Sequence, residues 1–257
     1  MNLFDLSGKT AVVIGGNSTL GSSMGEAFAA HGAHVAIVGR NPETSEAAKA
    51  RIEEAGGQGK TAVFQADATS KADLERVMAE VLAWSGRVDI LMNCPGKNSA
   101  TPFFDITEEE YDSIMDVNLK GVVLACQVFG KQMIEQGEGG SIINISSVSS
   151  GPPLSRVFTY SASKAGVNSV TQFLAREFAP HRVRVNGIIP GFFPAEQNKK
   201  ILSEERIRSI MGHTPMNRFG TPEELQGAAI YLASDKASGF VTGTFLRVDG
   251  GFGAMTI

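Results

Sequence analysis

Seven short apolar runs, rich in β-branched residues, alternate along the chain with longer segments of helical periodicity. Short runs that are apolar throughout are typical of strands buried on both faces of a parallel sheet. Right-handed crossovers between such strands place the intervening helices on both faces. The alternation therefore predicts an α/β fold, namely one doubly wound, Rossmann-type parallel sheet of about seven strands in the order 3-2-1-4-5-6-7.

The predicted elements follow one another without a linker, repeat or low-complexity segment, so residues 1–257 are expected to form a single domain. The strands are expected at 10–15, 34–39, 61–66, 88–94, 141–146, 184–189 and 244–249. The helices are expected at about 20–31, 42–56, 70–85, 107–137, 158–179 and 222–234. The connection at about 191–216 is long for a compact domain, which is typical of a lid over a binding site.

Composition excludes several classes of protein. A net charge of −4 argues against nucleic acid or an anionic membrane as a main partner. We also expect no membrane span, because no apolar run approaches 18 residues, and no signal peptide, because the first ten residues lack the basic and apolar regions of one. The two cysteines, Cys94 and Cys126, lie in apolar stretches, which favours free thiols in a reducing, cytoplasmic compartment. No metal site is expected.

The first predicted strand runs into a glycine-rich turn, "AVVIGGNSTLG" from Ala11, and a helix follows. This is the context that a dinucleotide-binding turn requires, because glycines let the backbone approach a pyrophosphate and the helix N-terminus offers free N–H groups. The pattern departs from G-x-G-x-x-G at Thr19, so a turn that only packs a helix on the sheet remains an alternative. Threonine would be strained at a positive φ, although its hydroxyl could contact a phosphate.

The end of the second strand indicates which dinucleotide binds. An acidic residue there would hold the ribose 2′-OH of NAD, whereas a basic one suits the 2′-phosphate of NADP. The residues present are Gly39, Arg40 and Asn41. They favour NADP(H) and leave NAD(H) possible, with a solvated loop charge as the alternative for Arg40.

The strongest signal for chemistry is a serine, tyrosine and lysine set in "SSVSSGPPLSRVFTYSASKAG". Tyr160 and Lys164 are four residues apart and share a helix face, and Ser147 follows the fifth strand, at the sheet edge where ligands bind. A nearby ammonium favours the phenolate of a tyrosine, and a hydroxyl can hydrogen-bond a substrate oxygen as it gains charge. The set suits proton transfer coupled to hydride transfer at a carbinol or carbonyl carbon.

With "ADA" at Asp67, "NCPG" at Asn93, "VNLKG" at Asn118, "IPG" at Pro190 and "VTGTFLRVDGGF", these motifs make the chain resemble the short-chain dehydrogenase/reductase superfamily over essentially its whole length. The resemblance implies that Tyr160 is the acid/base, that Lys164 lowers its pKa and holds the nicotinamide ribose, and that Ser147 steadies the substrate oxygen. It implies that Asn118 maintains a water link for proton relay, that Asp67 contacts the adenine and that the backbone after Pro190 faces the nicotinamide. The full set of expected cofactor-binding residues is Gly15, Asn17, Ser18, Thr19, Leu20, Gly21, Arg40, Asn41, Asp67, Ala68, Asn93, Cys94, Pro95, Gly96, Tyr160, Lys164, Pro190, Gly191 and Phe193.

The chain departs from the superfamily pattern at Thr19, where a glycine is usual, and at Cys94 and Pro95, where asparagine and alanine are usual. Ala195 stands where a threonine often contacts the carboxamide, so that contact is lost or passes to Glu196 or Gln197. None of these changes affects the four expected catalytic residues.

Cations near the predicted pocket indicate the substrate. Lys97 and Arg156 suit a substrate carboxylate, since arginine grips a carboxylate with two hydrogen bonds; solvated charges, or pairs with Glu108 to Glu110, are the alternative. "PGFFPAEQN", "HTPMNRFGTPEEL" and the C-terminal segment resemble sugar-acid oxidoreductases of the fructuronate reductase/mannonate oxidoreductase and gluconate 5-dehydrogenase type. The expected substrate-binding residues are Lys97, Asn98, Ser149, Arg156, Phe192 and Gln197.

The predicted function is NAD(P)-dependent oxidation of a secondary alcohol or reduction of a ketone, with a polar sugar or sugar acid as substrate. One alternative is a reductase of 3-oxoacyl or other hydrophobic ketones, with a pocket lined by Phe192, Phe193 and Met216. Another is a nucleotide-sensing protein without chemistry, but such proteins lose the tyrosine or the lysine. The resemblance also implies a homotetramer built on the two long helices, at about 107–137 and 158–179.

Overall fold

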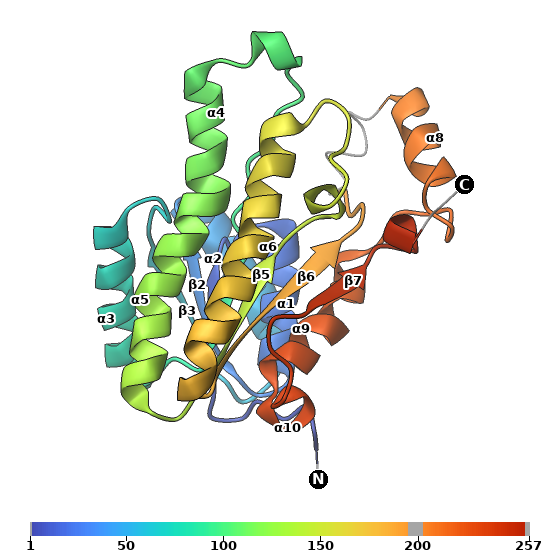
Figure 1. The fold of residues 1–257 in the computed structure, drawn as a ribbon. Coiled ribbons are helices and arrows are strands. Elements are labelled where there is room, and N and C mark those ends of the chain that lie inside the picture. The colour runs from blue at the N-terminus through green and yellow to red at the C-terminus, as the bar shows by residue number, and fades with distance from the viewer. Residues whose placement is uncertain (1, 195–202, 255–257) are drawn as a thin grey trace.

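The computed structural model describes residues 2–194 and 203–254. Its seven strands form one parallel sheet in the order β3-β2-β1-β4-β5-β6-β7, which confirms the predicted topology (Figure 1). The strands are β1 (Thr10–Ile14), β2 (His34–Gly39), β3 (Thr61–Gln65), β4 (Ile90–Asn93), β5 (Gly140–Ile145), β6 (Val183–Pro190) and β7 (Phe245–Val248).

Alternate residues of the central strands supply two hydrophobic cores, one on each face of the sheet. Ala11 and Val13 of β1 pack with one set of helices, and Val12 and Ile14 pack with the other. The first face is covered by α1 (Thr19–Ala30), α2 (Pro42–Glu54) and α9 (Gln226–Ala233). The second is covered by α3 (Lys71–Ser85), α5 (Gly121–Gln136) and α6 (Phe158–Phe178). Two-sided burial explains why the strands are apolar throughout.

The long helix expected at 107–137 is present but contains a change of pitch. It consists of α4 (Glu108–Met115), a π-helical turn (Asp116–Lys120) and α5. Its most apolar 18 residues reach a mean hydropathy of 1.2, and half of that window is buried inside the fold. The helix therefore passes a length and composition test for a membrane span, although its buried half belongs to the core of this domain. The π turn lies at the level of the site and contains Asn118.

The C-terminal third differs from the prediction in detail. The helix expected at 222–234 begins as a 3₁₀ turn (Pro222–Leu225), where Thr221 and Glu224 form a capping box, and continues as α9 and α10 (Asp235–Ser238). The expected lid contains a short helix, α8 (Glu204–Gly212), capped by Ser203. Residues 195–202 of the predicted lid lie outside the described residues.

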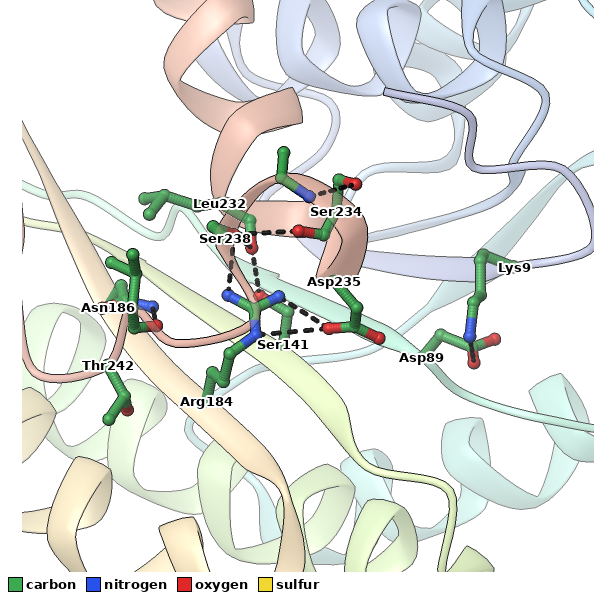
Figure 2. A network of polar contacts seen from close by, with 12 residues as sticks. Lys9, Asp89, Ser141, Arg184, Asn186, Leu232, Ser234, Asp235, Ser238 and Thr242 are labelled. Atoms are coloured by element: carbon green, nitrogen blue, oxygen red, sulfur yellow. Dashed lines mark hydrogen bonds and ion pairs between the residues drawn. The ribbon is translucent and has the colours of Figure 1, made fainter. Parts of the chain in front are cut away.

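A polar network joins α9 and α10 to the N-terminal ends of β5 and β6 (Figure 2). The buried guanidinium of Arg184, at the start of β6, donates to Asp235 Oδ1 at 2.9 Å and to Ser238 Oγ at 3.0 Å. Ser141 Oγ, on β5, donates to the Leu232 carbonyl at 2.8 Å. These bonds satisfy buried polar groups at the edge opposite the expected site.

Candidate active site

A cavity of about 830 Å³ opens beyond the C-terminal ends of β1, β2 and β4, at the edge where parallel sheets bind ligands. Its wall contains the glycine turn, the end of β2 and the segments after β3 and β4. The predicted cofactor residues on this wall are Gly15, Asn17, Ser18, Arg40, Asn41, Asp67, Ala68, Cys94, Pro95 and Gly96. The wall also contains eight residues outside the predicted cofactor set, namely Ile14, Val38, Gly39, Pro42, Glu43, Ala66, Thr69 and Val117.

The glycine turn has the form of a phosphate-binding cradle. Gly15 has a φ of +74°, and a Cβ there would lie 2.8 Å from the Cys94 carbonyl oxygen. A Cβ on Gly21 would lie 2.3 Å from the Gly15 carbonyl oxygen. Both positions require glycine, and Ser18 caps α1 by accepting a hydrogen bond from the Gly21 N–H at 3.1 Å. The close backbone approach and the helix N-terminus beside the cavity fit the pyrophosphate of a dinucleotide.

Thr19 causes no backbone strain in this turn. It is the first residue of α1, its side chain is exposed, and it is absent from the residues with a positive φ. The strain considered for this threonine therefore does not arise, because the turn reverses at Gly15 and not at position 19. Leu20 and Gly21 lie behind the turn, where Leu20 packs against the core.

The part of the cavity beside the end of β2 carries charges of both signs. Arg40 and Glu43 both line it, and Arg40 is exposed. The pKa of Asp67 is lowered, mainly because the Thr69 backbone N–H donates to its carboxylate, and with a smaller contribution from the charge of Arg40. The Thr69 hydroxyl also donates to Asp67 Oδ1, at 2.8 Å. These two hydrogen bonds from Thr69 hold the Asp67 carboxylate in one orientation at the cavity wall.

Lys164 lies fully inside the protein at the inner end of this region. Its ammonium donates to the Ile145 carbonyl at 2.8 Å and to the Pro95 carbonyl at 3.4 Å, so it joins the ends of β4 and β5. Burial lowers its pKa to about 8. Its Nζ atom lies 5.7 Å from the centre of the Tyr160 ring, which confirms the shared helix face on α6.

The side chains of Ser147, which follows β5, and Tyr160, on α6, form a hydrogen bond with each other. Burial raises the pKa of Tyr160 above its ordinary value of 10, and a hydrogen bond with Ser147 opposes that rise. The expectation of a lowered tyrosine pKa is therefore wrong for the protein alone, because desolvation of the phenolate outweighs the favourable contacts. Ser147 in turn accepts hydrogen bonds from the Ser149 backbone N–H at 3.2 Å and from the Ser149 hydroxyl at 3.0 Å. Ser149, predicted to bind substrate, thus orients Ser147.

Asn118 binds the polypeptide beside the pocket. From the π turn, its Oδ1 accepts from the Lys97 N–H at 2.7 Å, and its Nδ2 donates to the Lys97 carbonyl at 2.9 Å and to Ser163 Oγ at 3.0 Å. The Ser163 hydroxyl donates to the Tyr160 carbonyl at 2.7 Å. Asn118 therefore fixes the loop after β4 against the helix that carries the tyrosine, a connection that sequence spacing alone does not reveal.

Asn93 is not on the cavity wall. Its side chain is fully buried and donates to Asn144 Oδ1 at 2.9 Å, and Asn144 Nδ2 donates to Thr171 Oγ1 at 2.9 Å. The amides join β4, β5 and α6 inside the core. Side-chain alternation explains the difference: Cys94 reaches the wall, and its neighbour points to the other face. The Asn93 side chain thus makes a structural contact in the core, and a cofactor contact of this residue stays a prediction.

The residues predicted to bind substrate differ in what they contact. The Lys97 ammonium donates to Ser113 Oγ of α4 at 2.5 Å, and Asn98 Oδ1 accepts from the Ser99 N–H at 2.8 Å. Arg156 is exposed on the loop before α6 with a φ of 71°. Arg206 of α8, which sequence reasoning missed, donates to Ser155 Oγ of the same loop at 2.9 Å. Gln197 lies outside the described residues.

Phe192 and Phe193 line a second cavity, of about 370 Å³, with Met216 and the C-terminal segment Val248 to Gly251. Phe193 packs closely over Gly220, whose Cβ would lie 2.3 Å from the phenyl ring. Pro190 ends β6 beside Val248 of β7, and a Cβ on Gly191 would lie 2.7 Å from the Asp249 Cα. The segment after β6 is thus held against the C-terminal segment.

Comparisons with known proteins agree with this geometry. A family model described as enoyl-(acyl carrier protein) reductase matches residues 15–253. The chain is 37% identical to an NAD-dependent glycerol dehydrogenase of Listeria innocua, over 97% of this chain and 95% of that protein. It is 34% identical to gluconate 5-dehydrogenase of Gluconobacter oxydans, over 97% and 96%. A crystal structure of a gluconate 5-dehydrogenase from Burkholderia cenocepacia, in complex with NADP and tartrate, matches with a TM-score of 0.91 at 32% identity, over 99% and 98% of the two chains.

Proposed function

Since this chain belongs to the short-chain dehydrogenase/reductase family of oxidoreductases, we propose that it interconverts a secondary alcohol and a ketone of a sugar acid with a nicotinamide cofactor. The observation that carries the proposal is the meeting of Ser147, Tyr160 and Lys164 at the end of β5, beside a cavity of dinucleotide size. Relatives named for gluconate and for its 5-keto form support the sugar-acid substrate.

In this mechanism a bound nicotinamide supplies or accepts the hydride, and the protein handles the proton. Tyr160 is protonated at neutral pH because burial raises its pKa, so its hydroxyl donates the proton to the ketone oxygen in reduction. Ser147 donates a hydrogen bond to the same oxygen as it gains negative charge. The charge of Lys164, when protonated, favours the phenolate that remains, and Asn118 keeps the loop at Lys97 in place.

For the cofactor we propose a preference for NADP(H) over NAD(H). Arg40 lies on the ribose wall of the cavity, and no acidic residue ends β2. Relatives are not uniform, since one is named NAD-dependent and another structure contains NADP. Glu43 lies on the same wall, and its negative charge repels the 2′-phosphate, so it reduces the preference for NADP(H).

The assembly proposed is a homotetramer in a reducing, cytoplasmic compartment. Exposed aromatic side chains on α4, α6 and the turn before α4 support the assembly, since the exposed fractions are 96% for Phe104, 62% for Phe103 and 57% for Phe173. Cys94 and Cys126 are free and buried, which supports the compartment.

The test is turnover of a panel of 2- and 5-keto sugar acids with NADPH and with NADH, followed by the absorbance of the reduced cofactor. Tyr160→Phe is expected to abolish turnover and to leave cofactor affinity within about twofold, because it removes only the proton donor. Turnover retained by this variant contradicts the mechanism.

A second candidate function is reduction of a hydrophobic ketone. Phe192, Phe193 and Met216 give the second cavity an apolar part, which supports this candidate, and Arg218, Glu224, Arg247 and Asp249 line the rest of it. A keto-ester in the same panel decides between the two. Turnover of the keto-ester without turnover of any sugar acid replaces the first proposal with the second. Loss of turnover on every substrate, with cofactor still bound, favours a nucleotide sensor.

A further inference from the structure

The C-terminal segment forms a rigid turn that presents one aromatic side chain. Asp249, whose side chain is only 7% exposed, accepts hydrogen bonds from the backbone N–H groups of Gly251 at 3.0 Å and Gly253 at 2.9 Å. The preceding Gly250 and Gly251 have φ values of 63° and 88°, which favour glycine. The resulting 3₁₀ turn (Phe252–Ala254) fixes the position of the Phe252 ring.

Phe252 lies next to both ends of the predicted lid, 191–216. Its ring centre lies 5.5 Å from that of Phe192, which follows β6, and 6.1 Å from that of His213, which ends α8. Both distances are within the range of favourable aromatic contacts. The turn before the ring is also joined to the chain after α8, because the Met216 N–H donates to the Gly250 carbonyl at 3.1 Å.

Among the residues that the structure describes, few others hold α8 in place. Within α8 only Ile210 is buried, so the helix buries a small apolar surface of its own. At its N-terminal end Arg206 donates to Ser155, on the loop between Ser147 and Tyr160. At its C-terminal end His213 faces Phe252. In Figure 1, α8 stands apart from the sheet, beyond β6 and β7 and above the C-terminal turn.

We propose that Phe252 is a positioning residue for substrate binding. It acts through Phe192 and His213 to hold α8 against the loop that precedes α6. This inference rests on the proposed function, because it takes the side of the pocket covered by α8 as the place where the substrate binds. Phe252 is not among the residues that line the cavity beside the glycine turn. Its loss therefore affects how tightly the substrate is held and leaves the chemical step intact.

The test compares Phe252→Ala, Phe252→Tyr and the wild-type enzyme in steady-state kinetics and in cofactor titrations. Phe252→Ala is expected to raise the substrate KM about three- to tenfold, because two aromatic contacts are lost. The values of kcat and cofactor affinity are expected to stay within about twofold of the wild type. Phe252→Tyr keeps the ring and is expected to restore the wild-type KM. Phe240→Ala, which removes a fully exposed phenyl group from the same part of the chain, is the matched control with no expected effect.

Amide hydrogen exchange of 203–213 gives a second measurement that needs no turnover. Phe252→Ala is expected to speed exchange in this segment and to leave β4 and β5 unchanged. Unchanged exchange and unchanged KM overturn the proposal. Equal losses in kcat and cofactor affinity also overturn it, because they indicate general damage. If the wild type turns over no sugar acid, the proposed substrate is wrong, and the exchange experiment still decides whether Phe252 holds α8.

Discussion

Lys164 is an ionisable group that the fold buries at a cost. The unfolded chain keeps its proton up to a pKa of 10.5, whereas the folded chain keeps it only up to about 8. Between these values Lys164 binds more protons in the unfolded state, so its contribution to the stability of the protein rises with pH. The full difference corresponds to roughly 3 kcal/mol. The protein accepts this loss of stability to place a cation beside Tyr160.

The pH dependence of unfolding tests this directly. From pH 8 to pH 10 Lys164 contributes a rise in the free energy of unfolding of the cofactor-free protein, and the buried thiols of Cys94 and Cys126, whose pKa values are raised, oppose it. The test is therefore the difference between wild type and Lys164→Met, which is expected to shift in favour of the wild type as the pH rises over this range. Denaturant unfolding at several pH values measures it. Lys131→Met, at a lysine 75% exposed, is the control and is expected to keep the wild-type slope. A difference between wild type and Lys164→Met that stays constant with pH contradicts the assignment.

Arg40 and Glu43, which line the same cavity, are expected to make opposite contributions to NADPH binding. Arg40→Ala is expected to weaken NADPH binding about tenfold and NADH binding less than about twofold, because only NADPH carries the 2′-phosphate. Glu43→Gln, which removes a repulsive charge from the same wall, is expected to tighten NADPH binding. Titration of both variants with both cofactors measures the effect. Equal losses for the two cofactors in Arg40→Ala would mean that Arg40 does not contact the phosphate.

At the scale of elements, α10 is joined to the sheet by Arg184, whose side chain is 7% exposed. Arg184→Met is expected to lower the free energy of unfolding by about 2–3 kcal/mol, since it removes charged hydrogen bonds to Asp235 and Ser238 (Figure 2). Arg176→Met removes an exposed pair with Glu177 and is expected to cost less than about 0.5 kcal/mol. Urea unfolding separates the two. Equal costs would show that the network does not stabilise the junction.

Elements with strong periodicity could be predicted from the sequence, and elements without it could not. Two-sided burial makes each strand apolar, so the seven strands and their order followed from pattern and handedness. The π turn around Asn118 has no such signature, because π and α turns use the same residues. α8 is nine residues long, which is shorter than the window of about 11 to 18 residues over which helical periodicity is read.

The candidate site shows the same division. Residues on the cavity wall lie at the ends of strands, where chain order indicates them. The contacts of Asn93, Lys97 and Ser149 depend on which way each side chain points, and spacing does not give that direction. Thr19 shows that a missing glycine matters only where the backbone needs one, as at Gly15 and Gly21.

For the whole molecule, the proposed tetramer is expected in sedimentation velocity at micromolar concentration. The exposed phenyl groups of Phe103, Phe104 and Phe173 are expected to lie in its interfaces, since burial between subunits removes their apolar surface from water. Phe104→Glu combined with Phe173→Glu is expected to shift the protein towards smaller species, because burying a charge without a partner is costly. A wild-type monomer would contradict the proposal.

The N-terminal and C-terminal segments of the domain lie at different distances from the candidate active site. The chain starts below the sheet, where the Leu3 carbonyl accepts from Ser234 in the junction of α9 and α10, at the bottom of Figure 1. The C-terminal turn instead contacts Phe192 and His213 near the pocket. An affinity tag or surface linkage at the N-terminus is therefore expected to leave an immobilised enzyme working, whereas the same fusion at the C-terminus would disturb the segment that holds α8. The choice of attachment point thus follows directly from the direction of the strands.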